Sequence, residues 1–184
     1  MFEAQYSFGP ATRLQAQALG QPGQRTFRLL VENLDGRSAC LWLEKEQLQA
    51  LGLAVEQLIA EAPGRLASAS KPGPQPAAES FPPNPTIEFN VGRLALGQDE
   101  SELEQGPRFV LLAYDAESAW AEDQEEPPRL ATFSCRATRD QLRAVSRSIA
   151  DVVAAGRPRC PLCGEPLENV TQVHGCVRTN GHHA

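Results

Sequence analysis

The stretch EQLQALGLAVEQLIA, residues 46–60, has a close counterpart in DQLRAVSRSIADVVA, residues 140–154. The main apolar residues of both stretches fall at the same relative positions, 0, 3, 7, 10 and 11. They are Leu48, Leu51, Val55, Leu58 and Ile59 in the first stretch and Leu142, Val145, Ile149, Val152 and Val153 in the second. This spacing lines one face of an α-helix. The sequence therefore predicts two helices with equivalent apolar faces, which indicates an internal repeat.

Three β-rich segments precede each predicted helix. They span residues 12–19, 25–33 and 38–43 in the first half, and residues 86–97, 108–115 and 129–136 in the second. Each half therefore reads as three strands followed by a helix. We predict an α+β fold of two duplicated βββα units, residues 1–62 and 86–156, related by a pseudo-twofold axis.

The tetrapeptide ALGQ occurs in both halves, at residues 18–21 and 95–98. An arginine follows each copy, Arg25 in the first half and Arg108 in the second. The Pro-Gly pair after the first copy favours a type II turn. A repeated turn of this kind can bind an anion on its backbone N–H groups, and a plain hairpin turn is the alternative.

Two further predictions concern a helix N-terminus and two cysteines. Thr138 and Gln141 have the spacing of a capping box, in which a hydroxyl and a side-chain amide satisfy backbone N–H groups at the start of a helix. Cys40 and Cys135 lie in predicted strands, and we expect both to be small buried residues.

Residues 63–85 hold seven of the 15 prolines of the chain and have almost no apolar periodicity. This composition is typical of a linker. We expect a solvent-exposed crossover between the two units, with a polyproline segment that docks a partner as the alternative. The acidic segments QDESELEQGP and EDQEEPP are expected to be solvated loops.

The 184 residues, 41% of them hydrophobic, are enough to bury a core. The net charge of −6 argues against a general polyanion-binding protein. The sequence contains no apolar run long enough for a membrane helix and begins without the layout of a secretory signal, so we expect a cytoplasmic protein. Its five cysteines are an odd number and cluster near one end, which favours metal ligation over a disulfide framework.

The segment CPLCGEPLENVTQVHGC, residues 160–176, holds three of the five cysteines. Cys160 and Cys163 form a C-x-x-C pair, and His174 and Cys176 follow at a distance that a short hairpin can close. We predict that these four residues bind zinc in the C-terminal segment, residues 157–184. Four protein ligands leave no position for water, which favours a structural ion. A redox-active cysteine pair and unligated thiols are the alternatives.

Three motifs resemble an uncharacterised bacterial family, domain of unknown function 3090. They are LGQPGQRTF near the start, AGRPRCPLCGEPL at residues 155–167 and HGCVRTNG at residues 174–181. The resemblance covers nearly the whole chain and implies the same four metal ligands. Val177 replaces the proline of the family pattern, and the hairpin between the last two motifs is longer. The family has no assigned activity, and its association with kinase-like and phosphatase-like genes implies a phosphate-related pathway.

All three histidines lie in the last eleven residues, which excludes histidine acid–base chemistry from the body of the fold. No P-loop, G-x-S-x-G, H-E-x-x-H or dinucleotide fingerprint occurs in the sequence. We therefore expect a non-enzymatic binding or adaptor protein for a protein partner or a small anionic ligand. The candidate ligand-binding residues are Arg25, Arg157, Arg178 and Asn180. An enzyme that acts on a phosphorylated substrate is an alternative, because paired carboxylates leave no sequence signature.

Nucleic-acid binding is the other alternative. Residues 129–178 contain eight arginines and four acidic residues, although the chain as a whole is acidic. Arg139, Arg143 and Arg147 are spaced to form a stripe along the second predicted helix and can contact a phosphate backbone. A solvated charged face explains the same pattern. Neither tryptophan lies near the stripe in the sequence, so base stacking is not indicated.

Overall fold

The computed structural model describes residues 3–21, 24–61, 81–99, 108–119, 130–155, 160, 162–163, 167 and 175–176. The strands are β1 (Ala4–Leu19), β2 (Thr26–Asn33), β3 (Ser38–Leu43), β4 (Ile87–Asp99), β5 (Arg108–Asp115) and β6 (Ala131–Thr138). The helices are α1 (Lys45–Glu61), the short α2 (Ala116–Ala119) and α3 (Arg139–Ala155). The predicted α+β class is confirmed, and α2 was not predicted. Among the described residues, no helix is long and apolar enough to cross a membrane.

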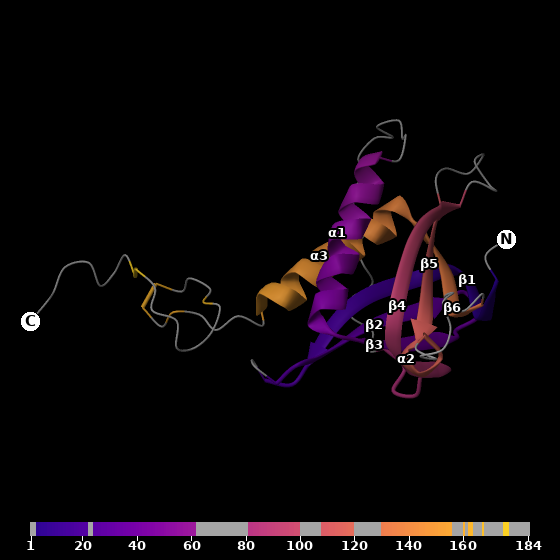
Figure 1. Ribbon diagram of the computed structural model, residues 1–184, viewed down its shortest axis with the longest axis horizontal. Helices are drawn as coiled ribbons and strands as arrows, with labels where there is room; N and C mark the ends of the chain where they lie inside the picture. Colours follow the sequence, from indigo (N-terminus) through magenta and orange to yellow (C-terminus); the bar gives the residue numbers. More distant parts are fainter. Residues whose placement is uncertain are drawn as a thin grey trace, which may run out of the picture.

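The six strands form a closed barrel in the order β1-β2-β3-β4-β5-β6 (Figure 1). Within each half, neighbouring strands run antiparallel. β1 pairs with β2 and β2 with β3 in the first half, and β4 pairs with β5 and β5 with β6 in the second. The halves join through two parallel pairs, β3 with β4 and β6 with β1. Closure pairs every one of these strands on both sides, so the barrel has no open edge.

The first strand of each half pairs with two different strands along its length. β1 pairs with β6 near its start and with β2 from Ala11 onward, and β4 changes from β3 to β5 in the same way. A register shift marks each change, between Ala11 and Arg13 in β1 and between Val91 and Arg93 in β4. An extra residue in one strand bends that strand. β1 begins at Ala4 and therefore starts earlier than the predicted residue 12.

A glutamine from α3 holds the bulge in β1. The Nε2 group of Gln141 donates a hydrogen bond of 2.7 Å to the carbonyl group of Ala11. Its Oε1 atom accepts a bond of 2.9 Å from the backbone N–H of Thr138, and the Thr138 hydroxyl accepts from the N–H of Gln141 at 3.3 Å. The predicted capping box is therefore confirmed. One side-chain amide therefore provides a hydrogen-bond partner both for a backbone N–H at the helix N-terminus and for a carbonyl group of the bulged strand.

Gln47 of α1 makes the matching contacts in the other half. Its Nε2 group donates to the carbonyl groups of Val91, at 3.0 Å, and Gly92, at 3.3 Å. Its Oε1 atom accepts a bond of 2.9 Å from the backbone N–H of Glu44. In each helix, therefore, one glutamine caps the helix N-terminus and also donates a hydrogen bond to the bulged strand of the opposite half.

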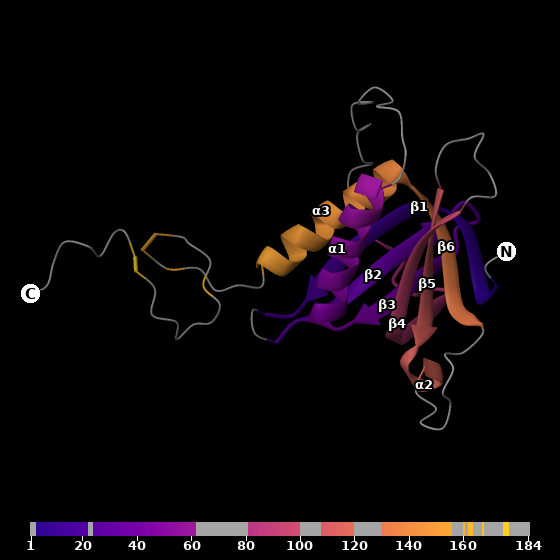
Figure 2. The ribbon, with the colours of Figure 1, turned by 45° about the horizontal axis from the view of Figure 1, so that its top comes forward.

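The two long helices lie against each other on one side of the barrel (Figures 1 and 2). The predicted apolar faces are confirmed, because Leu48, Leu51, Val55, Leu142, Val145 and Ile149 are buried in one core with the inward side chains of the strands. The helices approach closely at Gly52. A Cβ atom there would lie 3.1 Å from Cγ2 of Ile149, so a larger residue would push the helices apart.

The two ALGQ copies occupy different places. Within the first copy, Gly20 has a φ of 97°, and the carbonyl of Gln21 accepts a hydrogen bond of 2.9 Å from the N–H of Gln24. The first turn is therefore confirmed, while its Pro-Gly pair lies outside the described residues. The prediction of a second turn is wrong, because residues 95–98 lie inside β4, where pairing with β5 continues to Asp99.

Several predictions fall wholly or partly outside the described residues. The linker predicted at 63–85 is described only from residue 81 onward, where the Arg13 guanidinium lies 4.2 Å from the centre of the Phe81 ring. Residues 100–107 and 120–129, which include most of the predicted acidic loops, are also outside.

The glutamine contacts predict a measurable loss of stability. Gln141→Ala leaves the buried Ala11 carbonyl without its donor, and a lost buried hydrogen bond costs about 1–3 kcal/mol. Gln47→Ala should cost a similar amount, since its contacts are the same. Urea unfolding followed by circular dichroism measures both. The control is Gln57→Ala on the exposed face of α1, expected within about 0.5 kcal/mol of the parent. Equal stability of Gln141→Ala and Gln57→Ala would contradict the role of the amide.

Candidate metal centre

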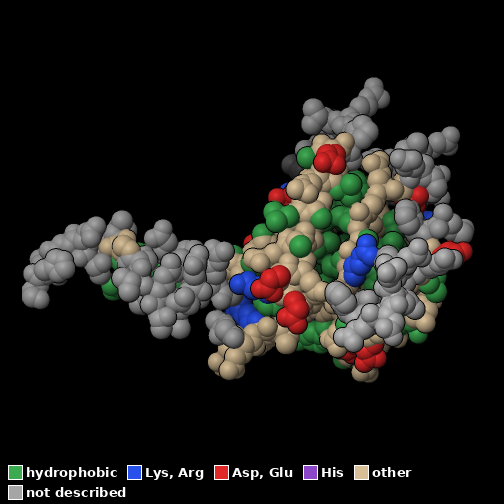
Figure 3. Space-filling view, viewed as in Figure 1, with side chains coloured by type: hydrophobic (Ala, Val, Ile, Leu, Met, Phe, Trp, Pro, Cys, Tyr) green, Lys and Arg blue, Asp and Glu red, His purple; other side chains and the backbone are tan. Residues whose placement is uncertain are grey.

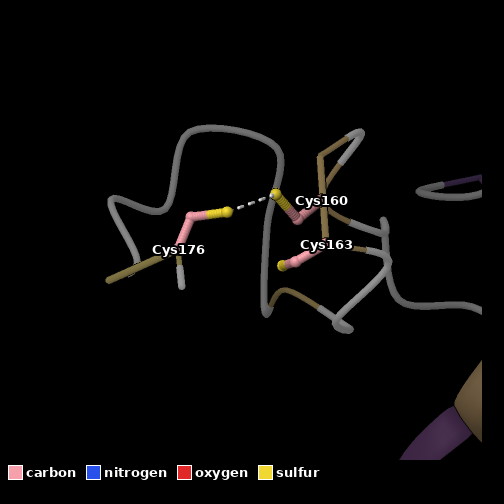
Figure 4. Close-up of side chains that lie close together, drawn as sticks. All are labelled: Cys160, Cys163 and Cys176. Atoms are coloured by element: carbon pink, nitrogen blue, oxygen red, sulfur yellow. Dashed lines mark hydrogen bonds between the residues drawn. The ribbon is translucent and has the colours of Figure 1, made fainter. Parts of the chain in front are cut away.

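Three cysteine side chains converge in the C-terminal segment (Figure 4). Cys160 and Cys163 come from the C-x-x-C turn, and Cys176 approaches from a separate stretch of chain. The three sulfur atoms all lie within 4.8 Å of one another. Thiolate ligands in such a cluster suit a soft or borderline metal ion. The predicted grouping of these cysteines is therefore present, and the cluster can hold a metal ion.

The separation of the sulfur atoms distinguishes ligation from a covalent bond. The Sγ atoms of Cys160 and Cys176 are 3.8 Å apart. A disulfide requires about 2.05 Å. Tetrahedral zinc with Zn–S bonds of about 2.3 Å places its sulfur ligands about 3.8 Å apart. The observed distance therefore excludes a disulfide between these two residues and is compatible with two ligands of one ion.

Burial in the cluster is uneven. Cys160 is 7% exposed and Cys176 is 5% exposed, whereas Cys163 is only partly buried. Leu167 packs with them and is itself buried, and the group is separate from the barrel core. Leu162 is exposed. Among the described residues of the segment, Leu167 is the one leucine that packs with the three sulfurs.

The remaining predicted residues of the C-terminal segment lie outside the described residues. These are the fourth predicted ligand, His174, and the candidate ligand-binding residues Arg157, Arg178 and Asn180. Cys160, Cys163 and Cys176 alone therefore define the centre in the described part of the chain.

The two cysteines of the barrel differ from those of the cluster. Cys135 points into the barrel core and is 1% exposed, and burial raises the pKa of its thiol to about 12. Cys40 is 2% exposed, and burial, reinforced by the nearby Glu88 carboxylate, raises the pKa of its thiol as well. The prediction of small buried strand residues is confirmed for both. Neutral thiols of this kind are poor nucleophiles and poor metal ligands.

Arg25, the remaining candidate ligand-binding residue, lies just before β2. Its side chain is partly buried, and its buried Nε atom has no hydrogen-bond partner among the described residues. A buried guanidinium N–H without an acceptor is energetically costly and attracts an anion. The second arginine of the predicted repeated turn, Arg108, begins β5 instead of following a turn at residues 95–98.

The three arginines predicted as a stripe lie on α3. Arg143 and Arg147 are exposed, whereas Arg139 is partly buried. The Nη1 atom of Arg143 lies 3.5 Å from Oδ1 of Asp140. On the face of the molecule in Figure 3, basic side chains form small separate groups, and acidic side chains lie beside one of them. A strong phosphate-binding surface instead gathers basic residues on one face.

A polar array on the outside of the barrel was not predicted. Arg28 donates two hydrogen bonds to Oε1 of Gln17, at 2.9 and 3.3 Å, and its guanidinium lies 5.6 Å from the centre of the Trp42 ring. The Trp42 indole donates to Glu88 at 2.6 Å. These residues come from four adjacent strands, so only the register of the sheet brings them together. Because its members pair with one another, the array is a structural feature of the barrel wall.

Comparison with known protein families identifies the family of this chain. The family model described as a protein of unknown function, DUF3090, matches residues 6–176. The chain belongs to the DUF3090 family. The match spans the barrel, both long helices and the cysteine cluster, so this DUF3090 protein contains all of these as parts of one family unit. No curated protein and no solved structure matches it.

Proposed function

We propose that this DUF3090 protein is a non-enzymatic binding protein whose C-terminal segment is ordered by a structural zinc ion. The proposed ligands are Cys160, Cys163, His174 and Cys176. The observation that carries the proposal is the convergence of three thiols with a sulfur–sulfur distance of 3.8 Å. Zinc accepts such a Cys₃His set in tetrahedral geometry.

Three features favour a structural over a catalytic ion. Two of the three sulfurs belong to buried residues, and four protein ligands leave no position open for a substrate or water. In the part of the chain that the structure describes, the barrel interior is filled by apolar side chains such as Phe109 and Phe133. Binding on the outer surface is therefore a better fit than chemistry inside the barrel.

Metal analysis tests the zinc site. Purified full-length protein, prepared without chelator, should contain one zinc ion per chain, and Cys163→Ser should lose it because one ligand is removed. Cys40→Ala is the matched control, since Cys40 lies in the barrel wall, and it should retain the ion. Protein without zinc, or a Cys163→Ser variant that keeps full occupancy, would overturn the site.

The domain boundary gives a second prediction. The C-terminal segment has few apolar residues, and ordering its backbone costs about 1–2 kcal/mol per residue. Structural zinc supplies on the order of 10 kcal/mol in isolated zinc fingers. A strong chelator should therefore make residues 157–184 sensitive to protease and leave residues 1–156 intact. Mass spectrometry of the limited digest identifies the cut. Unfolding of the whole chain in a single transition would show that the boundary is wrong.

The ligand proposed for this protein is a small anion or an anionic group on a partner. The partly buried Arg25 supports this choice, because its Nε atom has no acceptor within the described ranges. Arg157, Arg178 and Asn180 flank the cysteine cluster in the sequence, so zinc would fix their positions. Nucleic acid is the second candidate, and the exposure of Arg143 and Arg147 on α3 favours it.

Matched arginine variants separate the two candidates. Inorganic phosphate should raise the melting temperature of zinc-loaded protein, because a ligand at about 100 times its Kd adds about 2.7 kcal/mol. Arg25→Gln and Arg178→Gln should reduce this shift, whereas Arg143→Gln should leave it unchanged. Salt-sensitive retention on immobilised RNA that Arg143→Gln weakens, together with no phosphate shift, would favour nucleic acid and contradict the proposal.

We also propose that the two βββα halves are duplicated units. The matching bulges in β1 and β4 support this, as do the equivalent contacts of Gln47 and Gln141. The two parallel junctions between the halves, β3 with β4 and β6 with β1, also correspond. A duplicated unit accounts for equivalent long-range contacts that share only a short sequence pattern.

A further inference from the structure

The five cysteines fall into two chemical classes. Cys40 and Cys135 are held in the barrel as neutral, buried thiols. The other three have sulfur atoms gathered within 4.8 Å, close enough to exchange one ligated ion for a covalent bond between two of them. Oxidation chemistry is therefore available at the cluster and suppressed in the barrel.

We propose that the cysteine cluster is an oxidation site at which hydrogen peroxide joins Cys163 to a neighbouring cluster cysteine and expels the zinc ion. This inference rests on the proposed zinc site and adds a co-substrate and a change of state to it. Its geometric basis is the proximity of the three sulfurs and the difference in their exposure.

Cys163 is the point of attack. It is only partly buried, whereas Cys160 and Cys176 are 7% and 5% exposed. Susceptibility of a cysteine to peroxide follows its thiolate character and its exposure. Zinc ligation supplies thiolate character to all three ligands, so exposure decides which sulfur reacts first.

The reaction has two balanced steps. The Cys163 thiolate attacks one oxygen of peroxide, the O–O bond breaks, and a sulfenic acid and a hydroxide ion form. The thiolate of Cys160 or Cys176 then attacks the sulfenic sulfur, an S–S bond forms, the S–O bond breaks and a second hydroxide leaves. The two sulfurs together lose two electrons, which peroxide gains, and two protons from solvent convert the hydroxides to water.

The product cannot hold zinc as the reduced cluster does. Disulfide formation removes two of the four proposed ligands, so only one thiolate and His174 remain for an ion that prefers four. The two joined sulfurs, which lie within 4.8 Å of each other in the reduced cluster, also move to about 2.05 Å apart. Oxidation therefore releases the C-terminal segment, together with any anion that depends on its fixed position.

The barrel cysteines provide an internal control for this reaction. The thiol of Cys135 has a pKa near 12 because it is buried, and Cys40 is buried on the barrel wall. At neutral pH both are protonated, and peroxide reacts with the thiolate form. The same treatment should therefore leave both unmodified in the folded protein.

Peroxide titration of the full-length protein tests the inference, after metal analysis has shown one zinc ion per chain. About one equivalent of peroxide should release the zinc, detected with a chromogenic chelator, and remove two of the five thiols. Peptide mapping should place Cys163 in the new disulfide, and dimedone added during the reaction should label Cys163. Reductant with added zinc should restore all five thiols and the ion.

The double variant Cys40→Ala with Cys135→Ala is the matched control and should give the same zinc release per peroxide. The inference is overturned if zinc-loaded protein keeps its ion and its thiols under conditions that fully oxidise free cysteine. It is also overturned if the disulfide omits Cys163 or if the barrel thiols are oxidised equally. Protein that contains no zinc before peroxide is added contradicts the proposed function itself, so the two failures are distinguishable.

Discussion

The fold depends on two side-chain amides that each connect a helix N-terminus to a bulged strand in the opposite half. Gln141 joins α3 to the bulge in β1, and Gln47 joins α1 to the bulge in β4. A bend at each bulge lets one long strand pair with both halves, and only that change of partner allows six strands to close. The amides satisfy carbonyl groups that would otherwise be buried without donors. They therefore stabilise the bend that closure requires.

Closure determines where function can reside. A six-stranded barrel filled by its own side chains has little room for a ligand inside, and its wall is occupied by contacts such as those among Arg28, Trp42 and Glu88. The C-terminal cysteine cluster is different, because its described residues form a small group separate from the barrel core. The proposed zinc ion would order it, which would make it the part of this DUF3090 protein that a chemical signal can switch.

The distribution of cysteines follows the same division. The barrel keeps Cys135 neutral by excluding water from it, as the raised pKa of that thiol shows. The cluster gathers three sulfurs at ligand distance and leaves Cys163 partly accessible. One chain thus carries thiols protected by burial and thiols exposed to chemistry.

The sequence alone determined the elements that depend on local patterns. The apolar spacing predicted both long helices, the capping box located the start of α3, and the C-x-x-C motif located the cysteine cluster. Tertiary structure decided four other features. These are the closure of the barrel, the early start of β1, the extension of β4 through the second ALGQ copy and the contact of Gln141 with Ala11. These features depend on pairing between residues far apart in the chain. Local propensity carries no information about which distant backbone group lacks a partner, so only the assembled barrel reveals it.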